Sequence, residues 1–327
     1  MITRRHLLLG AAAVPLAACA PATSDRPSSP GSASALTLGL TYIPNVQFAA
    51  FYLGLGEGVF ASHGIDLRLR HHGAQEVVFG ALLAGEEDLV FCSGDEVAVA
   101  AAAGTDLRWV ATSYQQFPVA IFVAADSGIT SIAELAGRSV GVPGHYGSTY
   151  LGALAGLHAA GLGEADLDLL DIGYTQVTAL TTGKVDAVVG YLNNEAVQFR
   201  LAEFDAVALP VDDPVAPTLV GPGLGALQGT DTGTSTALAA AMLESEGLVI
   251  ADPEAAIDAT AEYVPNLNQA EQRETARSVL EATTALWLRE GELSVAVDPA
   301  AFERMSELFV ATGVSAEPVP AQTYIAD

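Results

Sequence analysis

The chain has 327 residues, half of them apolar, and a formal net charge of −26 from 13 basic and 39 acidic residues. This length suits one large domain or two packed ones, and the apolar half can form a sizeable core. The strongly acidic balance excludes a nucleic-acid partner and electrostatic docking on anionic lipid.

The first residues have the pattern of a bacterial export signal. Arg4 and Arg5 precede an apolar run over 7–18, which is shorter than the roughly 20 residues that a membrane-spanning helix needs. The surroundings of the two arginines resemble a twin-arginine signal. We therefore predict a signal peptide over 1–18 and leave the choice between the twin-arginine and the general export route open.

The cysteine that follows is predicted to carry a lipid. Residues 16–18 and Cys19 read LAAC, which resembles a lipobox. Residues 19–35 are rich in Pro, Ser and Ala and are predicted to be a flexible tether. Once Cys19 is acylated, Cys92 is the one remaining cysteine, so no intramolecular disulfide is expected, and its apolar neighbours favour a buried structural role.

From residue 36 onward, short apolar segments alternate with helical ones. Strands are predicted at 36–42, 65–71, 88–92, 107–113, 118–124, 139–143, 168–172 and 186–190. Helices are predicted at 46–60, 75–84, 95–103, 147–160, 175–182 and 193–202. Glycines lie where these helices should end, at Gly64, Gly85, Gly104, Gly161 and Gly183. This alternation predicts an α/β fold with parallel sheets and helices on both faces.

The pattern divides into two lobes. The segment 118–124 is interpreted as an extended crossing, and the Pro- and Gly-rich segment after Pro210 as the return crossing. Residues from about 232 to 312 read as helices. We predict two α/β lobes joined by a two-segment hinge with a helical C-terminus: lobe 1 over 36–124 plus about 214–327, and lobe 2 over about 125–213.

The loops after the predicted strands mix aromatic, amide and carboxylate side chains. Ligands of such sheets bind at the carboxyl ends of the strands. Aromatic faces on opposing lobes could hold a flat ring, with amides and carboxylates bonding to its edge. The predicted ligand-binding residues are Tyr42, Asn45, Gln47, Asp95, Phe117, Tyr146, Tyr174, Tyr191, Asn194 and Glu195.

These loops contain no Arg or Lys, and a strongly anionic ligand would normally meet one. The composition therefore favours a neutral ligand that offers N–H or O–H donors. Helix N-termini at Ser148 or Thr175 could still hold an anion.

The sequence motifs that would indicate catalysis or metal binding are incomplete in this chain. Residues 141–147 lack the GxGxxG order and the P-loop lysine. His71 and His72 alternate to opposite sides of a strand and cannot chelate one metal together. We predict no catalytic residues, no cofactor and no metal.

Six loop motifs follow one another in a recognisable order. They are YIPNVQFA, SG, QFPV, GVPG, YTQV and GYLNNE, at 42–49, 93–94, 116–119, 141–144, 174–177 and 190–195. This series resembles the extracytoplasmic substrate-binding proteins of ABC importers with the type II periplasmic-binding fold, in the branch for NMT1-type thiamine-pyrimidine and riboflavin binders. The last two motifs are most similar to riboflavin-type binders.

The resemblance implies a monomeric receptor, tied to the membrane through its N-terminal lipid, that binds a vitamin or vitamin precursor in the interlobe cleft. It would close around a neutral heterocycle such as riboflavin or a thiamine pyrimidine precursor and deliver it to an ABC permease and its ATPase. The alternatives are a receptor for sulfonates or similar small anions, a ligand sensor, and an enzyme like the yeast pyrimidine synthase. That enzyme uses a histidine, a lysine and a cysteine-rich signature, whereas this chain has Phe48 near the histidine position and Lys184 as its one lysine.

Overall fold

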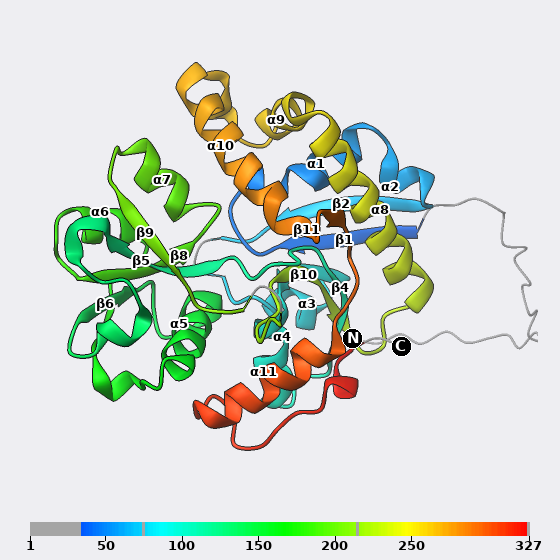
Figure 1. Ribbon diagram of the computed structural model, residues 1–327. Coiled ribbons are helices and arrows are strands. Elements are labelled where there is room, and N and C mark those ends of the chain that lie inside the picture. Colours follow the sequence, from blue (N-terminus) through cyan, green and yellow to red (C-terminus); the bar gives the residue numbers. More distant parts are fainter. Residues whose placement is uncertain (1–33, 74–75, 214–215, 326–327) are drawn as a thin grey trace, which may run out of the picture. The chain divides into compact units, whose positions relative to one another are not determined.

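The computed structural model describes residues 34–73, 76–213 and 216–325 (Figure 1). The predicted signal peptide, the lipidation site Cys19 and nearly all of the predicted tether lie outside these residues. Across the described ranges, no helix combines the length and the apolar character needed to cross a membrane.

The first sheet has five strands in the order β2-β1-β3-β10-β4. Their bounds are β1 Ser34–Leu40, β2 Ile65–His71, β3 Leu89–Ser93, β4 Leu107–Thr112 and β10 Pro222–Leu227. Strand β1 pairs in parallel with β2 and β3, and Leu38 lies opposite both Leu69 and Leu89. Strand β10 is antiparallel to both of its neighbours, β3 and β4.

The second sheet also has five strands, in the order β7-β6-β8-β5-β9. Their bounds are β5 Val119–Ala124, β6 Ser139–Val142, β7 Asp168–Asp171, β8 Ala187–Tyr191 and β9 Ala206–Pro210. Strand β6 is parallel to β7 and β8, whereas β5 is antiparallel to β8 and β9.

The helices lie close to the predicted segments. In the first part of the chain they are η1 Val46–Phe48, α1 Ala49–Gly56, α2 Val59–Ser62, α3 Gly80–Ala84 and α4 Gly94–Ala102. Those of the second sheet are α5 Gly147–Ala159, α6 Gln176–Thr181 and α7 Glu195–Leu201. The C-terminal ones are α8 Thr232–Ala251, α9 Pro253–Ala261, α10 Ala270–Trp287 and α11 Pro299–Ala311. Five further 3-10 helices are η2 Ala125–Ser127, η3 Ile132–Leu135, η4 Glu164–Asp166, η5 Pro265–Asn268 and η6 Ala321–Thr323. A small hairpin joins β11 Leu288–Arg289 to β12 Glu292–Leu293.

Two predictions about the strands were wrong. Strand β5 does not belong with the first sheet as an extended crossing, because it pairs with β8 and β9; the crossing is the segment 113–118. The Gly-rich segment after Pro222 is strand β10 rather than part of an irregular return, so both sheets are mixed instead of parallel.

Gly223 shows why the sequence did not predict strand β10. A Cβ on Gly223 would lie 2.1 Å from the Ala111 carbonyl oxygen and 2.6 Å from the Trp109 ring. Close approach of the β4 backbone therefore requires a residue without a side chain, and such a residue weakens the sequence pattern of a strand.

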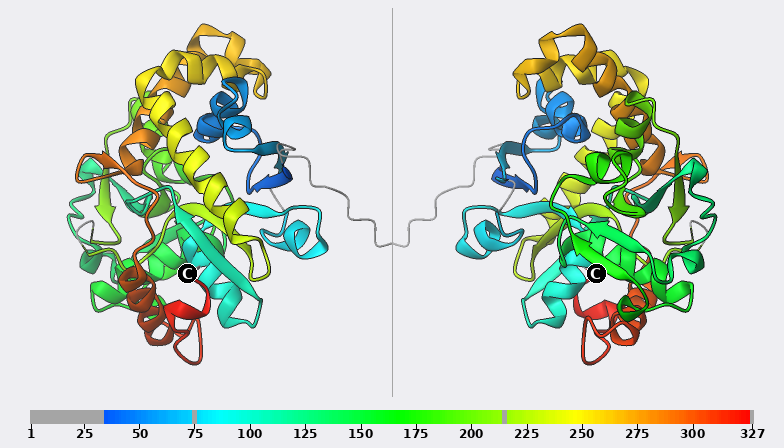
Figure 2. Two further views of the ribbon diagram at one scale, coloured as in Figure 1. Left: turned by 90° about the vertical axis from the view of Figure 1, so that its right-hand side faces the viewer. Right: turned by 90° about the vertical axis from the view of Figure 1, so that its left-hand side faces the viewer.

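Each sheet is covered on both faces. Helices α1, α8 and α10 contribute buried residues to one face of the first sheet, and α4 and α11 to the other (Figures 1 and 2). Helices α6 and α7 pack on one face of the second sheet and α5 on the other. The core that contains α4, α5 and α11 joins residues from both sheets. The two sheets therefore share part of one core.

Candidate functional site

The site begins where β3 passes directly into α4. Asp95 and Glu96 lie in the first turn of α4, and Oε2 of Glu96 accepts a hydrogen bond from the backbone N–H of Ser93 at 3.1 Å. Acidic residues suit this position because unpaired N–H groups give the helix N-terminus a partial positive charge. The local sequence Ser-Gly-Asp-Glu thus both starts the helix and places two carboxyl groups at the strand edge.

A second helix N-terminus, from the other sheet, meets these carboxyl groups. The hydroxyl of Ser148, in the first turn of α5, donates to Oδ1 of Asp95 at 2.8 Å. A Cβ added to Gly147 would lie 3.7 Å from Oε1 of Glu96. Asp95 is fully buried, and its Oδ2 is left without a hydrogen-bond partner in the described part of the chain.

The end of β8 provides the third side of the site. Oε2 of Glu195 accepts from the backbone N–H of Tyr191 at 2.7 Å, and Nδ2 of Asn194 donates to Oε1 of Glu195 at 3.1 Å. Glu195 is 7% exposed. A Cβ on Gly190 would lie 2.7 Å from Cγ of Glu195. Glycine at this position therefore lets the carboxyl group fold back over the strand end.

Burial dominates the electrostatics of these groups. It raises the pKa of Asp95 well above the usual range, with repulsion from Glu96 adding to the shift and the Ser148 bond opposing it. Burial likewise raises the pKa of Glu96 and Glu195. It also raises the pKa of Tyr191, and the nearby carboxyl groups of Glu96 and Asp95 raise it further. The carboxyl groups of the site therefore keep their protons to a higher pH than free carboxyl groups do.

Three predicted tyrosines form its exposed rim. Tyr146 and Tyr174 are 57% and 53% exposed, and Tyr42 is half-buried. Partial burial, followed by the neighbouring phenol of Tyr146, raises the pKa of Tyr174 to about 12, and Tyr42 and Glu96 add to the shift. The structure therefore brings together Tyr42, Tyr146, Tyr174, Tyr191, Asp95 and Glu195 of the predicted set.

The other predicted residues have local structural contacts. Oδ1 of Asn45 accepts from the backbone N–H of Gln47 and caps η1. The amide of Asn194 holds Glu195, and its Oδ1 accepts from Gln198 at 2.7 Å. Phe117 is a core residue, 8% exposed, whose ring lies 3.2 Å from a Cβ placed on Gly152 of α5.

Sequence reasoning did not select Glu96, Ser148 or Asn193 for the site. Nδ2 of Asn193 donates to Oγ1 of Thr283 in α10 at 2.9 Å and to the Tyr114 hydroxyl at 3.3 Å, so it also joins the two sheets. Ser148 was considered only as part of a helix terminus. The pattern that could have identified Glu96 is its place in the first turn of a helix beside a strand end.

The arginines near the sheets have partners elsewhere. Arg70 pairs with Glu76 and Glu87, and Arg108 donates to the carbonyl of Thr230. No group of three or more His, Cys, Asp or Glu side chains is arranged to hold a metal ion in the ranges that the structure covers.

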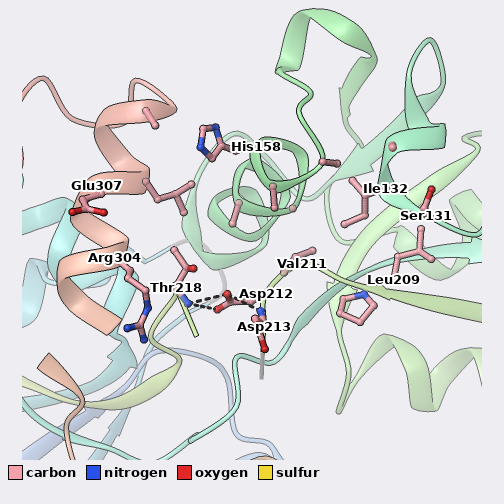
Figure 3. Close-up of a pocket in the computed structure, with 18 of the residues that line it drawn as sticks. Ser131, Ile132, His158, Leu209, Val211, Asp212, Asp213, Thr218, Arg304 and Glu307 are labelled. Atoms are coloured by element: carbon pink, nitrogen blue, oxygen red, sulfur yellow. Dashed lines mark hydrogen bonds between the residues drawn. The ribbon is translucent and has the colours of Figure 1, made fainter. Parts of the chain in front are cut away.

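Two cavities lie apart from these carboxyl groups. The larger, of about 860 Å³, is bordered by His158 of α5 and by Arg304 and Glu307 of α11 (Figure 3). The carboxylate of Asp212, which also lines this cavity, accepts from the backbone N–H of Thr218 (Figure 3) and is thereby satisfied. The smaller, of about 170 Å³, includes Phe117 in its lining.

Comparison with known proteins assigns this chain to a family. Residues 45–256 match the family described as "NMT1/THI5 like". The chain is 29% identical over 313 residues to the riboflavin-binding protein RibY of Chloroflexus aurantiacus, covering 93% of this chain and 88% of the relative. It is 24% identical over 176 residues to a putative thiamine biosynthesis protein of Haemophilus influenzae, covering 53% and 55% of the two chains.

Solved structures share the fold at low identity. The periplasmic aliphatic sulphonate binding protein SsuA of Escherichia coli is similar with a TM-score of 0.71 at 19% identity, covering 91% of this chain and 93% of that chain. The alkanesulfonate-binding protein SsuA of Xanthomonas axonopodis gives 0.68 at 18%, covering 89% and 98%. The predicted two-lobe α/β fold class and the general prediction of a solute-binding receptor are confirmed. Because the family match spans well over half of its length, this chain belongs to the NMT1/THI5-like family.

Proposed function

We propose that this receptor serves an ABC importer and binds a neutral heterocycle that donates hydrogen bonds, such as riboflavin or a thiamine pyrimidine precursor. The observation that carries the proposal is Oδ2 of Asp95, a buried carboxyl oxygen without a partner among the described residues. An unsatisfied buried acceptor costs about 1–3 kcal/mol. A ligand N–H or O–H group would satisfy it.

The tyrosines at the rim of the site favour a flat ligand. Tyr174 lies near Tyr146 and Tyr42 at the edge of the site, and aromatic faces stack on planar rings. The similarity to RibY, a riboflavin-binding protein, supports riboflavin in particular. The motifs at 174–177 and 190–195 favour the same choice.

A sulfonate ligand is the second candidate, favoured by the N-terminus of α5 and by the fold shared with the two sulfonate-binding proteins. At 18–19% identity that likeness concerns the fold. The loops that form the site contain no Arg or Lys to hold an anion, so the site supports the neutral ligand.

The test is calorimetry and thermal shift of the chain with riboflavin, the amino-hydroxymethyl-pyrimidine and hexanesulfonate. A ligand at 100 times its Kd should stabilise the fold by about 2.7 kcal/mol. Asp95→Ala should weaken binding, and Asp126→Ala, in an exposed turn, is the matched control. A response to hexanesulfonate alone would overturn the proposal.

The two sheets are proposed to act as the two lobes of the receptor. The chain passes between them through 113–118 and again after β9, and hinge closure at two such crossings would bring Ser148 to Asp95. The protein is proposed to work without catalysis. Recovery of the bound ligand chemically unchanged supports this, and a converted product contradicts it.

Export and anchoring are proposed from the N-terminal pattern. Cys19 would carry the lipid and tether the receptor outside the cell beside its permease. Cys19→Ser should abolish incorporation of labelled palmitate and release the protein from the membrane fraction, and a wild-type protein that takes up no label contradicts the proposal. Ligand-dependent transport in vesicles that contain a candidate ABC permease and its ATPase would distinguish a transport receptor from a sensor.

A further inference from the structure

Two consecutive histidines lie at the carboxyl end of β2, and their side chains belong to opposite faces of the first sheet. His72 is buried on one face, where its Nε2 lies 2.8 Å from Oε1 of Glu87. His71 lies on the other face, among aromatic side chains of α1 and of the segment 42–48, which follows β1. Consecutive residues of a strand alternate in this way. The proposed function uses neither histidine, yet His71 contacts a segment of the site.

His71 contacts the segment 42–48 at both of its ends. Nδ1 of His71 lies 3.4 Å from the backbone carbonyl oxygen of Tyr42, and its ring centroid lies 5.8 Å from that of Phe48. On the other side of the ring, Nε2 lies 3.2 Å from the hydroxyl of Tyr52 in α1. Tyr263, after α9, stacks on Tyr52 with ring centroids 4.0 Å apart and also lies beside His71. The imidazole therefore joins the segment 42–48 to α1.

These contacts decide which nitrogen of His71 carries the hydrogen. A carbonyl oxygen only accepts, so the Nδ1 that faces Tyr42 is the donor. Neutral imidazole has one such hydrogen, so Nε2 accepts from the Tyr52 hydroxyl. Burial raises the pKa of Tyr52, and a hydrogen bond from the backbone of Asn45 opposes the shift. The Tyr52 hydroxyl thus keeps its proton and contacts both His71 and the segment 42–48.

Protonation of His71 would break this arrangement. A charged imidazole carries a hydrogen on both nitrogens, so Nε2 could no longer accept from Tyr52. Partial burial lowers the pKa of His71; the carbonyl of Tyr42 opposes the shift and the neighbouring His72 adds to it. The neutral form is therefore complete above about pH 6.5 and is lost as the pH falls through the lowered value. Among the described residues, the titratable and charged groups around His71 are Tyr42, Tyr52, Tyr263 with its neighbour Glu262, and Arg70 and His72, which both contact Glu87.

We propose that neutral His71 is a positioning residue that holds the segment 42–48 in its ligand-binding position. The inference deepens the proposed function and rests on it, because Tyr42 lies near Tyr174 at the rim and His71 bonds to the backbone of Tyr42. His71 would act through Tyr42 rather than on the ligand. Affinity for the neutral ligand should therefore fall when His71 is protonated, and bound ligand should in turn make His71 harder to protonate.

Two variants test the role of the imidazole. Tyr52→Phe removes the hydroxyl that donates to His71. His71→Gln keeps one donor and one acceptor, as neutral imidazole has, but does not titrate. Calorimetry with riboflavin and the amino-hydroxymethyl-pyrimidine, between about pH 7.5 and about pH 4.5, measures affinity, and circular dichroism checks the fold at each pH.

Each variant has a matched control. Tyr324→Phe also removes a buried hydroxyl, which has no partner within the described ranges and lies in the core that contains α4, α5 and α11. His158→Gln removes an exposed histidine in the last turn of α5. Both controls should bind like wild type at every pH.

At neutral pH, Tyr52→Phe should bind about threefold to tenfold more weakly than wild type, whereas His71→Gln should stay within about twofold. As the pH falls, wild type should lose at least about threefold more affinity than His71→Gln, because the two proteins share every other titrating group of the site. In proton NMR spectra, the histidine resonance that is absent from His71→Gln should titrate at a lower pH when ligand is bound.

The inference can fail by itself. If wild type binds a neutral compound and Tyr52→Phe binds it equally well, or if His71→Gln loses as much affinity on acidification as wild type, the inference fails while the proposed function stands. His71→Gln decides alone if Tyr52→Phe does not fold. If wild type binds hexanesulfonate and neither neutral compound, the proposed function fails and the inference fails with it.

Discussion

At the residue scale, Tyr191 lies at the meeting point of three carboxyl groups, those of Asp95, Glu96 and Glu195. Tyr191→Ala should weaken binding of the neutral heterocycle by at least about 1 kcal/mol, the contribution of an aromatic pair. Calorimetry measures the loss. Tyr150→Ala is the matched control, because the Tyr150 hydroxyl donates to Glu164 away from the site. Unchanged affinity in Tyr191→Ala would remove Tyr191 from the site.

A second residue, Glu246 of α8, predicts how stability depends on pH. Glu246 is 1% exposed and accepts from the Ser113 hydroxyl, and burial raises its pKa from 4.5 to about 8. The folded state therefore holds a proton that the unfolded state releases, so this group lowers the free energy of unfolding as pH rises from about 4.5 to about 8.

Glu246→Gln removes that dependence. Relative to wild type, the variant should gain stability as pH rises through this window, with an upper limit on the order of 1.4 kcal/mol for each unit of pKa shift. Urea unfolding at the two ends of the window measures the difference. Glu317→Gln, at an exposed position, serves as the control. A stability difference from wild type that stays constant with pH would contradict the assignment.

At the element scale, α5 is positioned by small residues on the face that meets the second sheet. A Cβ on Gly152 would lie 2.8 Å from Cγ1 of Val119 and 3.2 Å from the Phe117 ring. Gly152→Ala should therefore destabilise the fold by about 1–3 kcal/mol, the usual range for overpacking.

The matched control is another helical glycine. A Cβ on Gly56, at the end of α1, meets nothing within 4 Å, so Gly56→Ala should be neutral or stabilise by up to about 1 kcal/mol. Chemical unfolding of both variants tests the contrast. Equal effects at the two positions would show that α5 does not pack as described.

At the element scale, sequence patterns predicted two helices of the site closely and missed one strand. The helices at 95–103 and 147–160 were predicted to within a residue of α4 and α5, because strong strand and glycine signals surround them. Strand β10 was missed because Gly223 makes room for β4. A glycine that is required because a neighbouring backbone lies close resembles a loop residue when only the sequence is considered.

At the scale of the whole molecule, Asn193 joins the second sheet to the first through Thr283 and Tyr114, all three buried. Asn193→Ala removes these bonds and leaves the hydroxyl groups of Thr283 and Tyr114 without that donor. The ligand-free protein should shift toward a more open form with a larger radius of gyration, measured by small-angle scattering, and lose about 1–3 kcal/mol of stability.

Asn268→Ala is the control for this change, because Asn268 makes a local bond to the carbonyl of Pro265. Its radius of gyration should match that of wild type. An unchanged radius in Asn193→Ala would mean that the bond to Thr283 does not help to hold the two sheets together.

The sequence by itself was enough to predict the alternation of strands and helices, because this depends on local periodicity. It was also enough to show the family resemblance and the loops that are rich in acceptors and free of Arg and Lys, because these depend on residue type. It also placed Asp95, Tyr191 and Glu195 at strand ends. Only the tertiary structure decided that β5 pairs in the second sheet, that Phe117 packs against α5, and that Ser148 meets Asp95. These features arise from contacts between segments far apart along the chain, and such contacts leave no periodic signal in the sequence.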